Sequence, residues 1–298
     1  MRPAPADRGG SPWTIQGRNV LITGASSGVG LATARALAAR GANLWLLCRD
    51  AQRGEAALDL CRATPGAGRL ELLLADLSSQ EEIRAVAAEF LARNEPLHVL
   101  VNNAAAVFFE RTQTVDEIES TLAVNHVAPF LLTHLLRPRL LESAPARVIT
   151  VASAGHRTGR IRLDDLGCQS HAYQGLVQYS HTKLANVLFT RELARRLEGT
   201  GVVAHSLHPG VIRTGLGMNN TGWLRVAWNA VRPLFSSPEK GADTVVFLVC
   251  DAGVQETNGA YWARRKSKRP GARGRDDEMA ARLWKASEAL ARIPDSTG

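Results

Sequence analysis

Short apolar runs alternate along the chain with longer segments in which apolar residues recur every three or four positions. The run at residues 19–23 is followed by Leu31, Ala34, Leu37 and Ala38, which lie at helical spacing. A short apolar run indicates a buried strand, and the spaced pattern indicates a helix with one buried face. Because the two patterns alternate, we predict an α/β fold with one doubly wound parallel sheet and helices on both faces.

The alternation extends over most of the chain. Strands are predicted at residues 19–23, 42–48, 70–74, 97–101, 147–151 and 202–207, and helices after residue 30, at about 79–93 and 115–136, and up to 197. No linker or internal repeat interrupts the pattern, so we predict one Rossmann-type domain over residues 17–262. A disordered leader is predicted at residues 1–16, and a basic segment with a C-terminal helix at 263–298.

A glycine-rich loop joins the first predicted strand to the first predicted helix. Such a loop lets the backbone approach a pyrophosphate, and the N–H groups at the start of the helix favour anions. The alternative is a glycine-rich turn that binds nothing. The residues that we predict to contact a dinucleotide here are Gly24, Ser26, Ser27, Gly28, Val29 and Gly30.

The second predicted strand ends in Cys48, Arg49 and Asp50. In dinucleotide-binding folds an acidic residue at this point binds the ribose 2′-hydroxyl of NAD, whereas an arginine suits the 2′-phosphate of NADP. Cys48 cannot supply the carboxylate, although Asp50 follows. The sequence therefore favours NADP(H), and the alternative for Arg49 is a solvated charge at the end of a strand.

Tyr179 and Lys183 are four residues apart in a predicted helix, so their side chains lie on one face of it. Of the three tyrosines in the chain, only Tyr179 has a lysine four residues further on. We expect the ammonium group to lower the pKa of the tyrosine from its usual value of about 10. Tyr179 is therefore a candidate acid/base near neutral pH.

Composition excludes some classes of protein. With 298 residues, of which 45% are hydrophobic and 21% charged, the chain is typical of soluble globular proteins. The net charge of +8 favours an anionic cofactor, lipid or nucleic acid without choosing among them. The four cysteines form no CxxC pair and the eight histidines are scattered, so no metal site is expected. No apolar run is long enough to span a bilayer, and we expect a soluble, cytoplasmic protein.

Taken together, these motifs resemble those of the short-chain dehydrogenase/reductase family over residues 17–262. The matching residues are Thr23 to Gly30, Asp76-Leu77, Asn102-Asn103-Ala104, Asn125, Ser153, Tyr179 with Lys183, and Pro209-Gly210 with Thr214. The resemblance narrows to the retinol-dehydrogenase-like branch through Cys48-Arg49-Asp50, Val124-Asn125-His126, residues 183–193, and His208-Pro209-Gly210-Val211.

The resemblance implies a role for each of four side chains. Tyr179 would transfer the proton to or from the substrate oxygen, and Ser153 would polarise the carbonyl. Lys183 would hold the nicotinamide ribose, and Asn125 would anchor a water relay behind it. Hydride transfer builds alkoxide charge, which two O–H donors stabilise. The resemblance implies further contacts with NADP(H) from Asp76, Leu77, Asn103, Ala104, Tyr179, Lys183, Pro209, Ile212 and Thr214.

The chain departs from the family pattern in three places. Ala105 stands where the family usually has glycine, and Ala152 stands where this branch often has a second serine, which leaves Ser153 as the candidate. The separation of Ser153 from Tyr179 is longer than in many members. It implies an inserted loop at residues 156–175 that we expect to line the site.

Two segments bear on the substrate and on partners. Residues 215–238 carry apolar side chains at helical spacing, as expected of a substrate loop for lipophilic alcohols or carbonyls, of an amphipathic covering helix, or of a helix at a membrane surface. Residues 264–275 are densely basic, which is typical of a solvated tail. Few aromatic residues lie among them, so no nucleic acid is expected, while contact with anionic lipid and a homo-oligomer remain open.

The sequence therefore predicts an NADP-dependent oxidoreductase of a lipophilic alcohol or carbonyl, such as a retinoid, a steroid or a long-chain aldehyde. The alternative is a non-catalytic NADP-binding sensor or scaffold. A degenerate binding module does not need Ser153, Tyr179 and Lys183 together, which favours the enzyme.

Overall fold

The computed structural model of the 298-residue chain describes residues 13–210 and 237–294. Ile212, Thr214 and nearly all of the predicted substrate loop at residues 215–238 lie outside the described residues.

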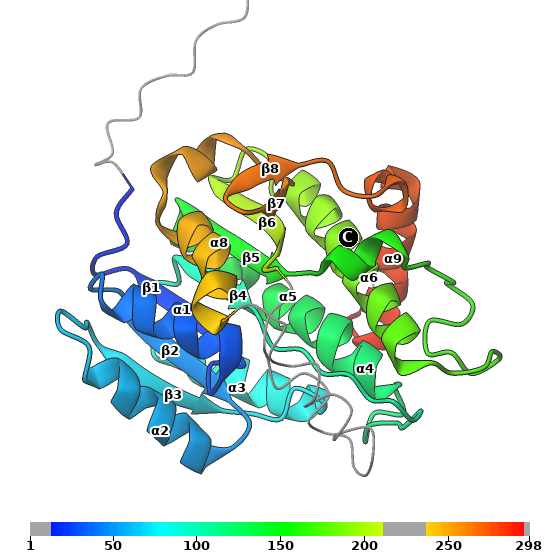
Figure 1. Ribbon diagram of the computed structural model, residues 1–298, viewed down its shortest axis with the longest axis horizontal. Coiled ribbons are helices and arrows are strands. Elements are labelled where there is room, and N and C mark those ends of the chain that lie inside the picture. Colours follow the sequence, from blue (N-terminus) through cyan, green and yellow to red (C-terminus); the bar gives the residue numbers. More distant parts are fainter. Residues whose placement is uncertain (1–12, 211–236, 295–298) are drawn as a thin grey trace, which may run out of the picture.

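An eight-stranded sheet runs through the centre of the molecule, in the order β3-β2-β1-β4-β5-β6-β7-β8 (Figure 1). All neighbouring strands are parallel except β7 and β8, which are antiparallel. The α/β prediction is confirmed. The strands are β1 Asn19–Thr23, β2 Asn43–Cys48, β3 Leu70–Leu74, β4 Val99–Asn102, β5 Ala146–Val151, β6 Val202–His208, β7 Tyr261–Ala263 and β8 Lys266–Lys268.

Helices cover both faces of this sheet. α1 (Gly28–Ala38), α2 (Ala51–Arg62) and α8 (Pro238–Cys250) pack on one face. α3 (Gln80–Ala92), α5 (Ala128–Glu142) and α6 (Gly175–Arg196) pack on the other. α9 (Asp277–Leu290) lies outside α6, as Figure 1 shows at the red end of the chain. No helix among residues 13–210 and 237–294 is both long and apolar enough to cross a membrane.

Successive residues of the central strands point to opposite faces, which explains their continuous apolar composition. In β1, Leu21 packs in the core beneath α3, α5 and α6, whereas Val20 and Ile22 pack in the core beneath α1, α2 and α8. Both faces of a parallel sheet are buried, so no polar alternation is expected in its strands.

The helix predicted at residues 115–136 begins later than expected. A bridge between Gln113 and Glu119 closes a turn in which Glu117 has a φ of 63°. The helix then starts with α4 (Ser120–Leu122), passes through the π-helical turn η1 (Ala123–Val127) and continues as α5. Single π-helical turns are frequent at functional sites.

Both predicted ends of the domain differ from the structure. Trp13 and Ile15, placed in the predicted leader, pack on the domain: Ile15 is buried, and the indole N–H of Trp13 donates to the Val249 oxygen at 2.9 Å. The predicted boundary at residue 262 falls inside β7, and residues 266–268 pair with it as β8. Part of the basic segment thus belongs to the sheet, because β8 pairs with β7 as an antiparallel edge strand.

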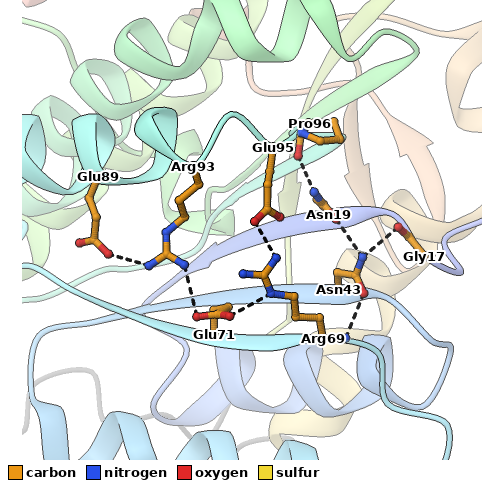
Figure 2. A network of polar contacts seen from close by, with 9 residues as sticks. All are labelled: Gly17, Asn19, Asn43, Arg69, Glu71, Glu89, Arg93, Glu95 and Pro96. Carbon is orange, nitrogen blue, oxygen red and sulfur yellow. Dashed lines mark hydrogen bonds and ion pairs between the residues drawn. The ribbon is translucent and has the colours of Figure 1, made fainter.

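A polar network ties β3 to α3 at the end of the sheet away from the glycine-rich loop (Figure 2). Arg69 contacts Glu71 at 2.9 Å and Glu95 at 2.6 Å, and Arg93 of the α3 C-cap contacts Glu71 at 3.3 Å. Such partly exposed ion pairs contribute little individually. They fix the edge strand far from the chemistry described below.

Candidate active site

A cavity of about 850 Å³ opens at the carboxyl ends of the strands, beside β1 and β4. The strand order reverses at these two strands, which is where open α/β sheets bind ligands. Of the predicted site residues, the cavity is lined by Gly24, Ser26, Ser27, Gly28, Val29, Arg49, Asp76, Leu77, Asn103, Ala104, Ser153, Tyr179, Lys183 and Pro209. Gly30 and Asn125 lie behind its wall.

The glycine-rich loop forms one wall through its backbone. Gly24 and Gly28 have φ values of 65° and 56°, which glycine tolerates better than other residues. A Cβ at Gly30 would lie 2.3 Å from the Gly24 oxygen, so Gly30 serves close packing. Ser27 is the N-cap of α1. Among the described residues, its side chain makes no capping hydrogen bond with the first turn of the helix. The N–H groups of the first turn therefore face the cavity ready for an anion.

Thr23, which the sequence analysis named within the matching motif but not as a site residue, fixes the opposite turn. Its Oγ accepts hydrogen bonds from the N–H groups of Asn103 and Ala104, both at 3.0 Å. The Asn103 side chain donates to the Thr23 oxygen at 2.9 Å. β1 and β4 are thereby locked at the edge where the cavity begins.

Two arginines line the far end of the cavity. Arg49 lies 4.0 Å from Asp76, and its side chain is 62% exposed. Arg53, four residues further on in α2, lines the same wall. Asp50 is the N-cap of α2 and accepts from the Arg53 N–H at 2.7 Å, so its carboxylate is used by the helix. The sequence analysis missed Arg53. Its position four residues after Arg49, at the start of a helix, was the signal that could have identified it.

Ser153 sits where β5 turns into the short helix η2 (Ala154–Arg157). Its Oγ accepts from the Gly155 N–H at 3.1 Å, which leaves the hydroxyl hydrogen available to donate. The Ser153 hydroxyl acts on Tyr179 in the direction of a lower pKa, against the effect of desolvation. The two hydroxyl groups therefore meet at the cavity wall.

Tyr179 and Lys183 project from α6 as their spacing predicted, with Nζ of Lys183 5.4 Å from the centroid of the Tyr179 ring. Tyr179 is partly exposed at the cavity wall, but desolvation by the surrounding residues raises its pKa to about 12, and Ser153 opposes the shift. Burial also lowers the pKa of Lys183 to about 7, and its Nζ donates to the Val151 oxygen at 2.9 Å. The sequence analysis expected a lowered pKa for Tyr179, but the pKa is raised, because desolvation dominates and the opposing contribution comes from Ser153 and not from Lys183.

Asn125 lies in the π-helical turn and is fully buried. Its side chain accepts from the Ala106 N–H at 2.7 Å and donates to the Ala106 oxygen at 2.9 Å. It also donates to the hydroxyl of Thr182, the neighbour of Lys183, at 3.2 Å. Asn125 thus joins the loop after β4 to α6.

The loop at residues 156–175 does not line the described cavity, contrary to expectation. It closes instead on the buried carboxylate of Glu119, which accepts from Gln178 at 2.8 Å and from Tyr173 at 3.0 Å. The Tyr173 hydroxyl also lies 2.9 Å from the Phe108 oxygen, and its single hydrogen serves one of these two acceptors at a time. The loop therefore supports the cavity wall from behind, because its polar groups are satisfied inside the fold.

The substrate end of the cavity is lined by residues that the sequence analysis did not predict as site residues, although it named two of them within matching motifs. They include Phe108, Val124, Leu176 and His208. Their elements were predicted, but the fold alone determines which of their side chains reach the cavity. Among the described residues, no group of three or more His, Cys, Asp and Glu side chains could hold a metal ion.

The doubly wound sheet, the glycine-rich loop at its switch point and the serine-tyrosine-lysine wall define a dinucleotide-binding α/β protein. A family model described as short chain dehydrogenase matches residues 18–225. The chain belongs to the short-chain dehydrogenase/reductase family and is an oxidoreductase of that family.

Curated relatives lie in the branch that the sequence suggested. Retinol dehydrogenase 12 of Bos taurus is 42% identical over 278 residues, which cover 93% of this chain and 87% of the relative. Retinol dehydrogenase 14 of Mus musculus is 40% identical over 298 residues, which cover 96% and 89%.

Solved structures share the fold. A crystal structure of an uncharacterised protein from Mycobacterium Paratuberculosis has a TM-score of 0.76 at 34% identity and covers 95% of this chain and 98% of its own. L-sorbose reductase from Gluconobacter frateurii, complexed with NADPH and L-sorbose, has a TM-score of 0.64 at 25% identity and covers 84% and 95%.

Proposed function

We propose that this protein is an NADP-dependent oxidoreductase that interconverts a lipophilic alcohol and its carbonyl compound. One observation carries the proposal: Ser153, Tyr179 and Lys183 line the same cavity whose far end carries Arg49 and Arg53. The three hydroxyl and amino groups suit chemistry at a carbonyl, and the paired guanidinium groups suit a phosphate.

The residues present fit a dinucleotide. The free N–H groups at the start of α1 suit its pyrophosphate, and Arg49 with Arg53 suits a 2′-phosphate. Asp50 is engaged as a helix cap and does not line the cavity, so it is not available to select the 2′-hydroxyl of NAD. We assign the nicotinamide ribose to Lys183, and Pro209 lines the same cavity.

In the direction of carbonyl reduction, Tyr179 donates the proton. Because desolvation holds its pKa near 12, the phenol is protonated at neutral pH and can give its proton to a developing alkoxide. The Ser153 hydroxyl donates a second hydrogen bond to the same oxygen, where charge builds during the reaction. NADPH, when bound, supplies the hydride.

The apolar side chains at the substrate end suggest the substrate class. Phe108, Val124 and Leu176 offer surface to a hydrocarbon chain or ring. Relatives named retinol dehydrogenase support a retinoid among the candidates. A non-catalytic NADP-binding sensor or scaffold is the competing proposal, and contact with a membrane surface or a second copy is compatible with either.

The test is turnover by the purified protein with NADPH and straight-chain aldehydes of increasing length, all-trans-retinal and a sugar. We expect kcat/KM to rise with chain length, because each buried CH₂ contributes about 0.8 kcal/mol. Sugars as the better substrates would contradict the lipophilic class.

Tyr179→Phe should abolish turnover while NADPH binding, measured by fluorescence titration, changes less than about threefold. The ring is kept and only the proton donor is lost. Tyr261→Phe is the matched control, and it should remain active. Substantial turnover by Tyr179→Phe would contradict the proposed catalytic role and favour the non-catalytic NADP-binding sensor or scaffold.

A further inference from the structure

Two histidines that the proposed chemistry does not use hold the serine loop, which we define as residues 153–159. His208, the last residue of β6, lines the cavity, and its Nδ1 lies 3.2 Å from the Ala154 N–H that donates to it. His156 is fully buried within the loop itself. Its Nδ1 lies 2.6 Å from the oxygen of Ser153.

The hydrogen bonds assign a tautomer to each ring. The Gly271 N–H donates to Nε2 of His156 at 3.0 Å, so that nitrogen is unprotonated and Nδ1 carries the hydrogen given to Ser153. Nδ1 of His208 accepts and is likewise unprotonated. Burial lowers the pKa of both rings, which keeps them neutral. Each ring therefore has one fixed partner in the serine loop.

The His156 ring has neighbours on two sides. The Tyr261 ring lies 4.7 Å from it, centroid to centroid. On another side a Cβ built at Gly271 or at Gly274 would lie 3.7 Å from Cδ2 of His156. The ring is therefore gripped between β7 and the segment that follows β8.

That segment also contacts the serine loop at Arg157 and Gly159, which follow His156. Arg157 donates to the Arg269 oxygen at 3.2 Å, and Arg273 donates to the Gly159 oxygen at 3.3 Å. With the bond from Gly271, these contacts join residues 269–273, hereafter the clasp segment, to the loop that carries Ser153. The basic stretch expected to be a solvated tail thus forms part of the wall behind the site.

We propose that His156 and His208 are positioning residues that hold the Ser153 hydroxyl against Tyr179, and that the clasp segment completes this support through Gly271. The inference rests on the proposed function, since it gives Ser153 its role. A displacement of about 1 Å in a reacting group costs roughly a hundredfold in rate. Loosening the serine loop should therefore lower kcat and leave cofactor binding intact.

The first test exchanges His208, in the full-length protein with NADPH and all-trans-retinal or decanal. The amide oxygen of His208→Asn reaches the place of Nδ1 and can accept from Ala154, whereas that of His208→Gln reaches the place of Nε2. We expect His208→Asn to keep kcat within about threefold and His208→Gln to lose about tenfold or more, with KM for NADPH unchanged. Equal kcat values for the two folded variants would overturn the role of His208.

The second test addresses the clasp segment. Gly271→Pro deletes the N–H and replaces it by a ring carbon that points towards Nε2 of His156, while Gly271→Ala keeps the N–H. The φ of Gly271 is −55°, which both residues adopt. We expect Gly271→Pro to lose about tenfold or more in kcat and Gly271→Ala to lose little. Equal activity of the two would remove the clasp segment from the proposal.

A structural control separates positioning from stability. His205 is also fully buried in β6 and also makes two hydrogen bonds, but it does not line the cavity. His205→Leu should lower the melting temperature with kcat within about twofold. If it lowers kcat as much as His208→Gln, the effect is structural and the inference is wrong. If Tyr179→Phe keeps its turnover, the proposed function is wrong. If Tyr179→Phe is inactive but His208→Gln and Gly271→Pro keep the wild-type kcat, only the positioning inference is wrong.

Discussion

At the residue scale, the site contains side chains whose pKa values are shifted by desolvation towards the neutral form. Lys183 is 1% exposed, and burial lowers its pKa to about 7. Asp50 caps α2 rather than facing a ribose, which leaves Arg49 and Arg53 as the charges at that end of the cavity. Perturbed pKa values of this kind concentrate at functional sites.

Arg49→Ala should remove most of the preference for NADPH over NADH. A hydrogen bond to a charged group contributes about 1.5 to 3 kcal/mol, so we expect roughly a tenfold or larger loss of NADPH affinity. Affinities for both cofactors, measured by titration, provide the check. Arg53→Ala tests whether the second arginine shares the phosphate, and equal affinity of the wild type for both cofactors would contradict the assignment.

Lys183→Met should abolish turnover yet stabilise the fold at neutral pH. The pKa of this lysine is 10.5 in the unfolded chain and about 7 in the folded chain. Between pH 7 and 10.5 the unfolded chain binds the proton more tightly, so burial of Lys183 destabilises the wild type at neutral pH. We expect Lys183→Met to gain more than about 1 kcal/mol in the free energy of unfolding at pH 7.

The stability of the wild type should rise as the pH increases from 7 towards 10, because the unfolded state then releases its proton. The advantage of Lys183→Met should shrink over the same range. Urea denaturation of both proteins along this pH series measures the difference. A variant less stable than the wild type throughout would show that burial of Lys183 has no such cost.

At the element scale, α9 supports the helix that carries Tyr179 and Lys183. The Trp284 ring lies 4.8 Å from the Phe130 ring of α5 and 5.9 Å from the Phe189 ring of α6. Its residue is 5% exposed. α9 therefore extends the core beyond α6 rather than forming an appendage.

Trp284→Ala should destabilise the protein by about 3 to 5 kcal/mol, the usual cost of truncating a buried aromatic residue. Denaturant unfolding measures the loss. Lys285→Ala, at the next and exposed position, should change stability by less than about 0.5 kcal/mol. Similar losses in both variants would mean that α9 contributes through helix formation and not through its aromatic contact.

At the scale of the whole molecule, neutral histidines tie distant segments together. His126 and His205 are fully buried, and burial lowers the pKa of each to about 4. His126 lies 2.8 Å from the Ser287 hydroxyl of α9, and His205 accepts from the Trp262 indole at 3.2 Å. Their contacts require the uncharged ring.

The protein should lose stability as the pH falls from about 6.5 towards 4. In that range the unfolded chain protonates these histidines and the folded chain does not, so each contributes a loss approaching about 1.4 kcal/mol per pH unit. Urea midpoints along the series give the slope. His126→Gln should reduce the slope of unfolding free energy against pH by about the contribution of one histidine. An unchanged slope would show that His126 is not neutral in the folded protein.

The sequence by itself determined the sheet, the glycine-rich loop and the placement of Tyr179 with Lys183. These follow from local patterns: apolar runs require burial, glycines permit the turn, and a four-residue spacing sets one helix face. Strand order at the switch point then brings the motifs to one edge.

Only the tertiary structure decided the ionisation of Tyr179 and the place of the basic segment. Each depends on surroundings contributed by residues far away in the chain. Desolvation reverses the pKa shift that spacing suggests, and Gly271 reaches His156 only because β8 folds back on β7. Contacts between segments so distant in sequence are set by packing, which no local pattern encodes.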